Sequence, residues 1–200
     1  MLCLQRATDP TWLKCALSHI DQVLVDHAHC EHKAAVTALS FVSRYSDDPE
    51  LVLRLSALAS EEAEHLHRVA ALCEKRGLHL GHPERDTYAK TLLNQARPDT
   101  LGHRIDRLLV CSIIEARSCE RLKLLAENLE DPDLRDFYDE LWRCEAGHHM
   151  LFVELAQRSL CRGTGISTNE AKEQIRTRLA ELSHFESELL QTLPVRPAIH

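Results

Sequence analysis

Apolar side chains recur every three to four residues along most of the chain, which is the spacing of amphipathic helices. In the first such stretch Leu13, Leu17, Ile20 and Leu24 follow this rule. The same periodicity predicts helices at about 10–45, 49–76, 99–129, 132–160 and 167–192.

Local helix-start signals agree with these boundaries. Asp followed by Pro occurs at 9–10, 48–49 and 131–132. Asp is a favourable N-cap residue, and Pro fits the first position of a helix. Ser167 and Glu170 have the spacing of a capping box, which marks the start of the last helix.

The connection at residues 77–98 is long enough for a crossover and contains a predicted short helix at 86–96. Two helical hairpins joined by one long crossover have the ferritin-like connectivity. The low content of glycine and proline, 6 and 7 residues, also favours helices over turn-rich sheets. We therefore expect an all-α, ferritin-like four-helix bundle in a single domain over 1–200, with its core at about 10–160 and an accessory C-terminal helix at about 167–192.

Each of the four long apolar stripes is interrupted by charged or titratable residues. They are Glu31 in the first helix, Glu62 and His65 in the second, Glu115 in the third, and Glu145 and His148 in the fourth. Residues equidistant from the turn of an antiparallel hairpin lie at one level, and both glutamate pairs are centred on their predicted turns. The sequence therefore predicts four inward-facing carboxylates in one layer.

Four buried carboxylates need cationic partners, because burying unpaired charge costs many kcal/mol. Glu from two helices and Glu-x-x-His from the other two is the ligand set of di-iron and di-manganese carboxylate bundles. Imidazole and carboxylate donors suit iron or manganese, whereas zinc in a cysteine-rich chain would more often take thiolates. We expect two iron ions, and manganese stays open.

The ordinary interpretation of one Glu-x-x-His is a solvated surface pair. Two such motifs at stripe positions, matched to two further glutamates, favour a metal site instead. Glu64 and His67 repeat the motif off the stripe, so they are expected to face solvent. His27 lies one turn before Glu31 and is either a residue that supports a ligand or a hydrogen-bonded core histidine.

Other histidines and the cysteines are not expected to be ligands. Cys30 and Cys144 adjoin predicted ligands, but neighbouring helical residues point about 100° apart, so buried packing is expected. Eight cysteines without a CxxC pair predict reduced thiols in a cytoplasmic protein, with no disulfide partner, signal peptide or membrane span. The histidines expected at the surface or the rim of the site are His29, His32, His79, His82, His103 and His149.

Several segments resemble one family. Residues 114–121, Ile-Glu-Ala-Arg-Ser-Cys-Glu-Arg, together with 26–31 and 61–65, are similar to the MiaE family of tRNA 2-methylthio-N6-isopentenyladenosine hydroxylases. The resemblance extends over most of residues 10–160 and includes Tyr88-Ala89-Lys90 and Phe137-Tyr138.

The resemblance implies a di-iron enzyme that hydroxylates the isopentenyl side chain of the adenosine at position 37 of tRNA. It implies O2 as co-substrate and electrons from a reductase or ferredoxin. When the metal ligands of the family are carried over by position, they are the same six residues that interrupt the apolar stripes. Gly147, within the fourth-helix motif, and His149, beside a ligand histidine, depart from the family pattern.

A net charge of −7 by itself argues against a nucleic-acid partner. The charge is uneven, however: residues 68–123 carry 11 basic and 7 acidic side chains. An ordinary solvated helix face is the competing interpretation of each basic residue. The candidate tRNA contacts are Arg85, Lys90, Arg97, Arg117, Arg121 and Lys123.

Two other functions stay open from the sequence. A ferroxidase or iron-handling bundle would share the fold and the ligands but use no organic substrate. A non-enzymatic helical module would use the polar layer only to specify packing. A peroxidase of the rubrerythrin type is disfavoured, because the chain has no CxxC pair for a second iron site.

Overall fold

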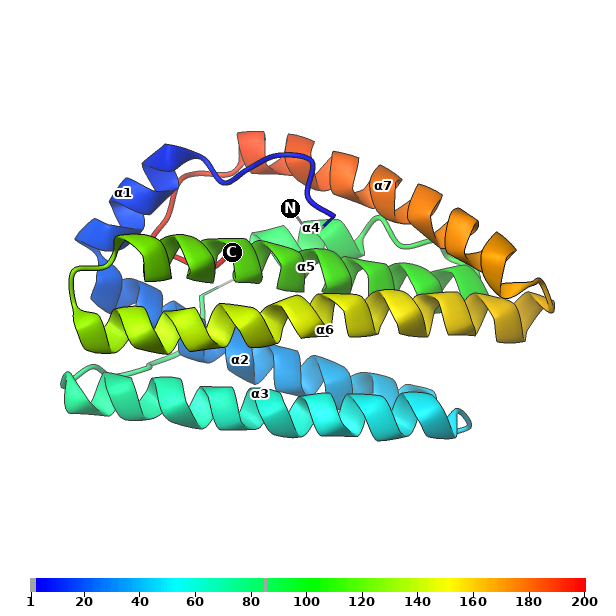
Figure 1. Cartoon of the computed structure of the whole chain (residues 1–200), viewed down its shortest axis with the longest axis horizontal. Coiled ribbons are helices and arrows are strands. Elements are labelled where there is room, and N and C mark those ends of the chain that lie inside the picture. Colours follow the sequence, from blue (N-terminus) through cyan, green and yellow to red (C-terminus); the bar gives the residue numbers. More distant parts are fainter. Residues whose placement is uncertain (1–2, 85) are drawn as a thin grey trace. The chain divides into compact units, whose positions relative to one another are not determined.

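A computed structural model describes residues 3–84 and 86–200, and every regular element within them is a helix (Figure 1). The helices are α1 (Pro10–Ser18), α2 (Ile20–Arg44), α3 (Pro49–Lys75), α4 (Thr87–Leu93), α5 (Thr100–Asn128), α6 (Pro132–Thr164) and α7 (Thr168–Thr192). None of the described helices combines the length and apolar character needed to cross a membrane.

The helices form two compact units. One, here called the large unit, contains residues 3–17, 86–195 and 200. The other, the hairpin unit, contains residues 18–84 and 196–199. The expectation of a single domain over the whole chain stays a prediction.

The hairpin unit is built on α2 and α3, which run antiparallel through the turn at 45–48 (Figure 1). Asp48 caps α3 by accepting a hydrogen bond from the Leu51 amide, and Pro49 occupies the first turn, as predicted. Leu24, Phe41, Leu51 and Leu55 are fully buried along the stripe.

The large unit is built on α5 and α6, joined at 129–131, with α7 packed on both and α4 packed on α5 and α7. Asp131 caps α6, and Ser167 and Glu170 form the predicted capping box of α7. Leu108, Ile113 and Tyr138 are fully buried in this unit.

The structure corrects two helix boundaries. The first predicted helix is two helices, α1 and α2, because His19 leaves the helical conformation with φ −135° and ψ 42°. This break lies where the chain passes from the large unit to the hairpin unit, which apolar spacing does not reveal. The fourth helix continues past 160 to Thr164, since the left-handed residue that ends it is Gly165, with φ 75°.

Candidate metal centre

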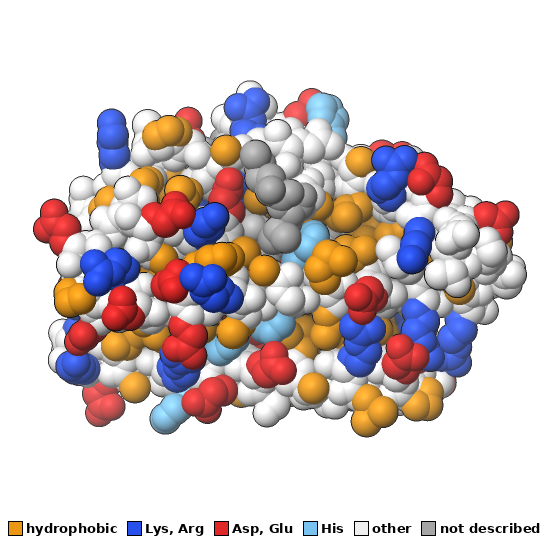
Figure 2. All heavy atoms as spheres, viewed as in Figure 1, with side chains coloured by type: hydrophobic (Ala, Val, Ile, Leu, Met, Phe, Trp, Pro, Cys, Tyr) orange, Lys and Arg blue, Asp and Glu red, His pale blue; other side chains and the backbone are white. Residues whose placement is uncertain are grey.

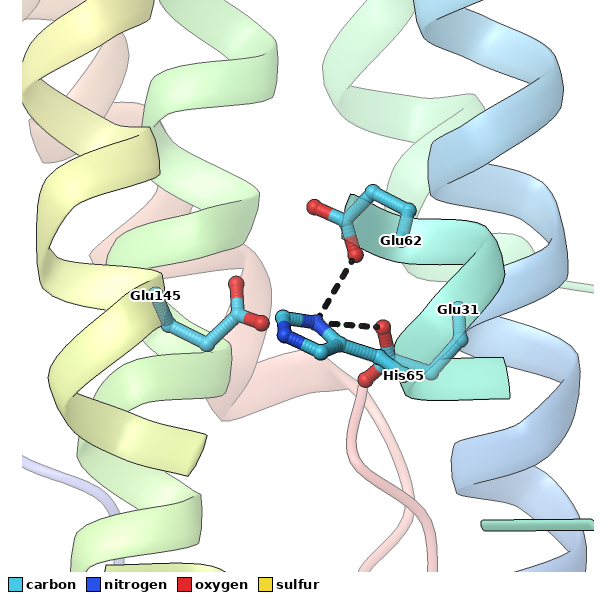
Figure 3. A group of neighbouring side chains, drawn as sticks. All are labelled: Glu31, Glu62, His65 and Glu145. Carbon is cyan, nitrogen blue, oxygen red and sulfur yellow. Dashed lines mark ion pairs between the residues drawn. The ribbon is translucent and has the colours of Figure 1, made fainter. Parts of the chain in front are cut away.

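The hairpin unit brings three of the predicted ligands together. Glu31 of α2 and Glu62 and His65 of α3 are buried and offer ligand atoms within 4.8 Å of one another. The Nδ1 atom of His65 lies 3.5 Å from Glu31 Oε2 and 3.5 Å from Glu62 Oε2 (Figure 3). We call these three residues the hairpin half-site.

His27 holds the other oxygen of Glu31. Its Nε2 atom lies 2.6 Å from Glu31 Oε1, one helical turn away, and its side chain is 1% exposed. Oε1 therefore bonds to His27 while Oε2 faces His65, which fixes the plane of the carboxylate. Glu64 and His67 are exposed, so the prediction that this second Glu-x-x-His faces solvent is confirmed.

The large unit repeats the arrangement with the remaining predicted ligands. Glu115 of α5 and Glu145 and His148 of α6 are buried, with ligand atoms within 4.8 Å of one another. His148 Nδ1 lies 3.3 Å from Glu145 Oε2. We call these three residues the large-unit half-site.

The donor chemistry of each half-site fits a divalent transition metal. Two donors about 2.1 Å from a shared ion are separated by about 3.0 Å at right angles and 3.4 Å at tetrahedral angles. The nitrogen–oxygen separations of 3.3 and 3.5 Å are close to this range. Two carboxylates neutralise one divalent cation, and neither half-site includes a thiol among the described residues.

His149 is not at the surface or the rim, contrary to the expectation. It is 3% exposed, and its Nδ1 atom lies 2.7 Å from Ser112 Oγ and 2.9 Å from the Ser112 carbonyl oxygen. Burial lowers the pKa of His149 below its usual value, which favours the neutral imidazole. We interpret His149 as a buried residue that links α6 to α5 by hydrogen bonding.

His29, His79 and His82 line a cavity of about 330 Å³ in the hairpin unit. His29 is half-buried and bonds to the Leu80 carbonyl oxygen at 2.9 Å, while His79 and His82 are exposed, as expected. His32 is exposed as well, and His103 is half-buried.

All eight cysteines are free thiols in this structure. Cys30 is buried as expected. Cys144 is exposed, so the expectation of buried packing was wrong for it. Its neighbour Glu145 faces the core, which turns Cys144 outward on the helix.

One predicted tRNA contact is corrected. Arg117 is fully buried, and its guanidinium bonds to Glu186, Glu120 and Thr8, so it does not reach a phosphate. Glu186 is not among the functional residues predicted from the sequence. The signal for it was an acid in the apolar stripe of the last helix, because Glu186 follows Leu182 by four residues and precedes Leu189 by three.

The other candidate contacts differ in exposure. Lys90 and Lys123 are exposed. Arg97 is exposed but pairs with Asp106 at 2.9 Å. Arg121 is half-buried over the Trp12 ring at 4.7 Å, and burial lowers its pKa to about 10. Arg85 lies outside the described residues.

Two curated proteins are similar to this chain. The curated tRNA 2-(methylsulfanyl)-N(6)-isopentenyladenosine(37) hydroxylase of Pseudomonas putida is 38% identical, with 74% of this chain and 72% of that protein covered. The protein of the same name from Salmonella typhimurium is 31% identical, with 68% of this chain and 67% of that protein covered.

A solved structure, protein 43 with aldehyde deformylating oxygenase activity from Synechococcus, is 37% identical with a TM-score of 0.88. The match covers 100% of this chain and 96% of that chain, and it confirms the all-α, ferritin-like fold class. A family model described as tRNA-(MS[2]IO[6]A)-hydroxylase (MiaE) matches residues 1–200. The chain therefore belongs to the MiaE family.

Proposed function

We propose that the two half-sites together hold one di-iron centre with six ligands, Glu31, Glu62, His65, Glu115, Glu145 and His148. The support is that each half-site repeats the same donor set in a buried hairpin. Four carboxylates match the charge of two divalent ions. Iron is proposed over manganese because the family is a family of hydroxylases.

We further propose that the chain is an oxidoreductase that hydroxylates the isopentenyl side chain of 2-methylthio-N6-isopentenyladenosine at position 37 of tRNA. The whole-chain match to a tRNA hydroxylase family carries this proposal. The curated relatives named for the same adenosine support it. A tRNA substrate also supports the predicted cytoplasmic location.

Bound iron would supply the oxidising power to insert an oxygen atom from O2 into a C–H bond, with electrons from an external reductase or ferredoxin. The chain's own residues would orient the ligand atoms and exclude water from them, since every ligand side chain is buried. His27 would hold Glu31 in one orientation. The target adenosine has to leave its stack in the anticodon loop to reach such a site.

The test is nucleoside analysis of tRNA after incubation with iron-loaded protein, reductant and O2. Wild type is expected to add one oxygen to the isopentenyl adenosine. Glu62→Ala is expected to abolish this and to reduce bound iron. Glu64→Ala, on the same helix but exposed, is the matched control and should behave as wild type. Iron-loaded wild type that leaves the nucleoside unchanged would contradict the substrate assignment.

A second candidate function follows from the solved structure from Synechococcus, because its identity of 37% is within one percentage point of the 38% of the Pseudomonas putida hydroxylase and above the 31% of the Salmonella typhimurium one. Identity alone therefore does not separate a tRNA substrate from an aldehyde. The same iron-loaded protein should be given an aldehyde in a parallel reaction. Loss of the aldehyde with no change in tRNA would favour this second function. A third reaction without organic substrate measures iron oxidation alone, as the ferroxidase alternative requires.

A further inference from the structure

A buried ion-pair cluster lies two residues beyond Glu115 on α5. Nε and Nη2 of Arg117 donate to the two carboxylate oxygens of Glu186 at 2.9 and 3.0 Å. Nη2 also donates to the Arg6 carbonyl oxygen at 2.9 Å. Nη1 donates to Thr8 Oγ1 at 3.0 Å and to Glu120. All five N–H groups of the guanidinium therefore have acceptors.

The partners of Arg117 come from separate parts of the large unit. Glu186 belongs to α7 and is fully buried. Tyr88 of α4 donates its hydroxyl to Glu186 Oε1 at 3.1 Å. Burial raises the pKa of Tyr88 well above its usual value, so this hydroxyl stays a donor. The Arg117 guanidinium thus connects α5 to α7 and to residues 6–8, and Glu186 extends this network to Tyr88 of α4.

This cluster and the metal ligand use different faces of one helix. Residues two positions apart on an α-helix point about 200° apart, so Arg117 faces away from the direction of Glu115. A carboxylate about 6 Å from the helix axis moves by about 0.5 Å when the helix rotates by about 5°. A displacement of about 0.5 Å is the tolerance of a productive site. Fixing the rotation of α5 therefore matters for a ligand on it.

We propose that Arg117 and Glu186 are positioning residues that set the rotation of α5 and thereby the placement of the Glu115 carboxylate in the metal centre. This inference rests on the proposed di-iron centre. It gives the last helix, α7, a part in the site, although α7 contributes no ligand. It also explains why the segment 114–121 of α5 contains a buried charged residue, Arg117.

The test uses Co²⁺ as the probe, because its visible absorption reports ligand geometry without any turnover. Metal-free wild type is titrated with Co²⁺ and compared with Glu186→Gln, which removes the charge but keeps the shape. We expect about tenfold weaker binding of one of two Co²⁺ ions and a changed visible spectrum, in line with losses of outer-sphere partners. Arg117→Lys should give a change in the same direction.

The matched control is a second ion pair between the same two helices. Arg178 of α7 binds Asp106 of α5 through two hydrogen bonds at 3.1 and 3.0 Å, and Asp106 is fully buried. Asp106 lies nine residues before Glu115, about 14 Å along the helix. Asp106→Asn should weaken folding but leave the Co²⁺ affinity and spectrum as in wild type.

Several outcomes would overturn the inference. They are a wild-type Co²⁺ spectrum and affinity in Glu186→Gln, or equal changes in Asp106→Asn. If Glu186→Gln does not fold, Thr8→Val removes only one acceptor of Arg117, and an unchanged Co²⁺ spectrum in it would also contradict the proposal. Wild type that binds no Co²⁺ would instead overturn the di-iron centre itself, and the inference with it.

Discussion

The two half-sites share a ligand set but differ in what surrounds it. In the hairpin unit, support comes from within the same helix, since His27 bonds Glu31 one turn away. In the large unit, α5 is fixed by an arginine whose acceptors lie on α7 and residues 6–8. The same ligand motif can therefore be positioned either by a hydrogen bond from a neighbouring side chain or by contacts that fix the rotation of the whole helix.

Among the described residues, each unit exposes three large apolar side chains, which in the large unit are Leu93, Met150 and Val195. The hairpin unit exposes Val36, Leu39 and Leu53, each at least 50% accessible. Figure 2 shows orange side chains interspersed with charged ones on the face drawn there. Isolated exposed apolar residues of this kind are common in proteins and need no partner.

The largest effect is expected from removing the imidazole of either half-site. His65→Ala and His148→Ala should each lower the hydroxylation rate by about 1,000-fold or more, because both ions act together. Bound iron should fall from two ions per chain to about one. Metal analysis and single-turnover nucleoside analysis measure these effects. Full activity in one variant would show that the half-sites are not equivalent.

The second prediction compares the stability contributed by the Arg117–Glu186 pair with that contributed by the His27–Glu31 hydrogen bond. Glu186→Ala leaves the Arg117 charge buried without its main partner, which is expected to destabilise metal-free protein by about 3–5 kcal/mol. His27→Ala removes one hydrogen bond, which is expected to cost about 1–3 kcal/mol. Urea unfolding of both variants provides the comparison. A larger loss of unfolding free energy in His27→Ala than in Glu186→Ala would contradict this prediction.

A third prediction concerns metal affinity at the hairpin half-site. His27→Ala should weaken binding of one metal ion by about 10–100-fold, as is usual when a partner of a ligand is lost. The exposed His67 supplies a control on the neighbouring helix, and His67→Ala should bind as wild type does. Isothermal titration with Co²⁺ measures both variants.

The smallest effect is a pH dependence confined to the large unit. Although burial opposes it, hydrogen bonds from Arg178 and Arg97 lower the pKa of Asp106 below its usual value. A carboxyl group with a lowered pKa in the folded state stabilises the protein above its unfolded pKa. That contribution, on the order of 1 kcal/mol, is lost as pH falls below about 4. Metal-free Asp106→Asn should not show this loss of stability when its thermal unfolding is measured at decreasing pH. If its stability falls with pH as in wild type, the prediction is wrong.

Periodicity and capping signals predicted the long helices because both are local properties of the chain. The break at His19 was not predictable in this way, since no Pro or Gly marks it. The ligands stood out because charged residues occupied apolar positions. Arg117 was misassigned because a basic residue looks the same in sequence whether it faces solvent or a buried acid 69 residues away.

The hairpin unit has a further property that concerns the order of synthesis. Residues 196–199 belong to it: the Ile199 amide donates to Asp26 at 2.7 Å, and Arg196 pairs with Glu84 at 2.6 Å. At about 5–20 residues per second, a ribosome needs on the order of 10 s to pass from residue 84 to residue 196. During that interval α2 and α3 lack one wall of their cavity. A nascent chain arrested before residue 196 should therefore be cut by protease at 78–84 more readily than the released protein.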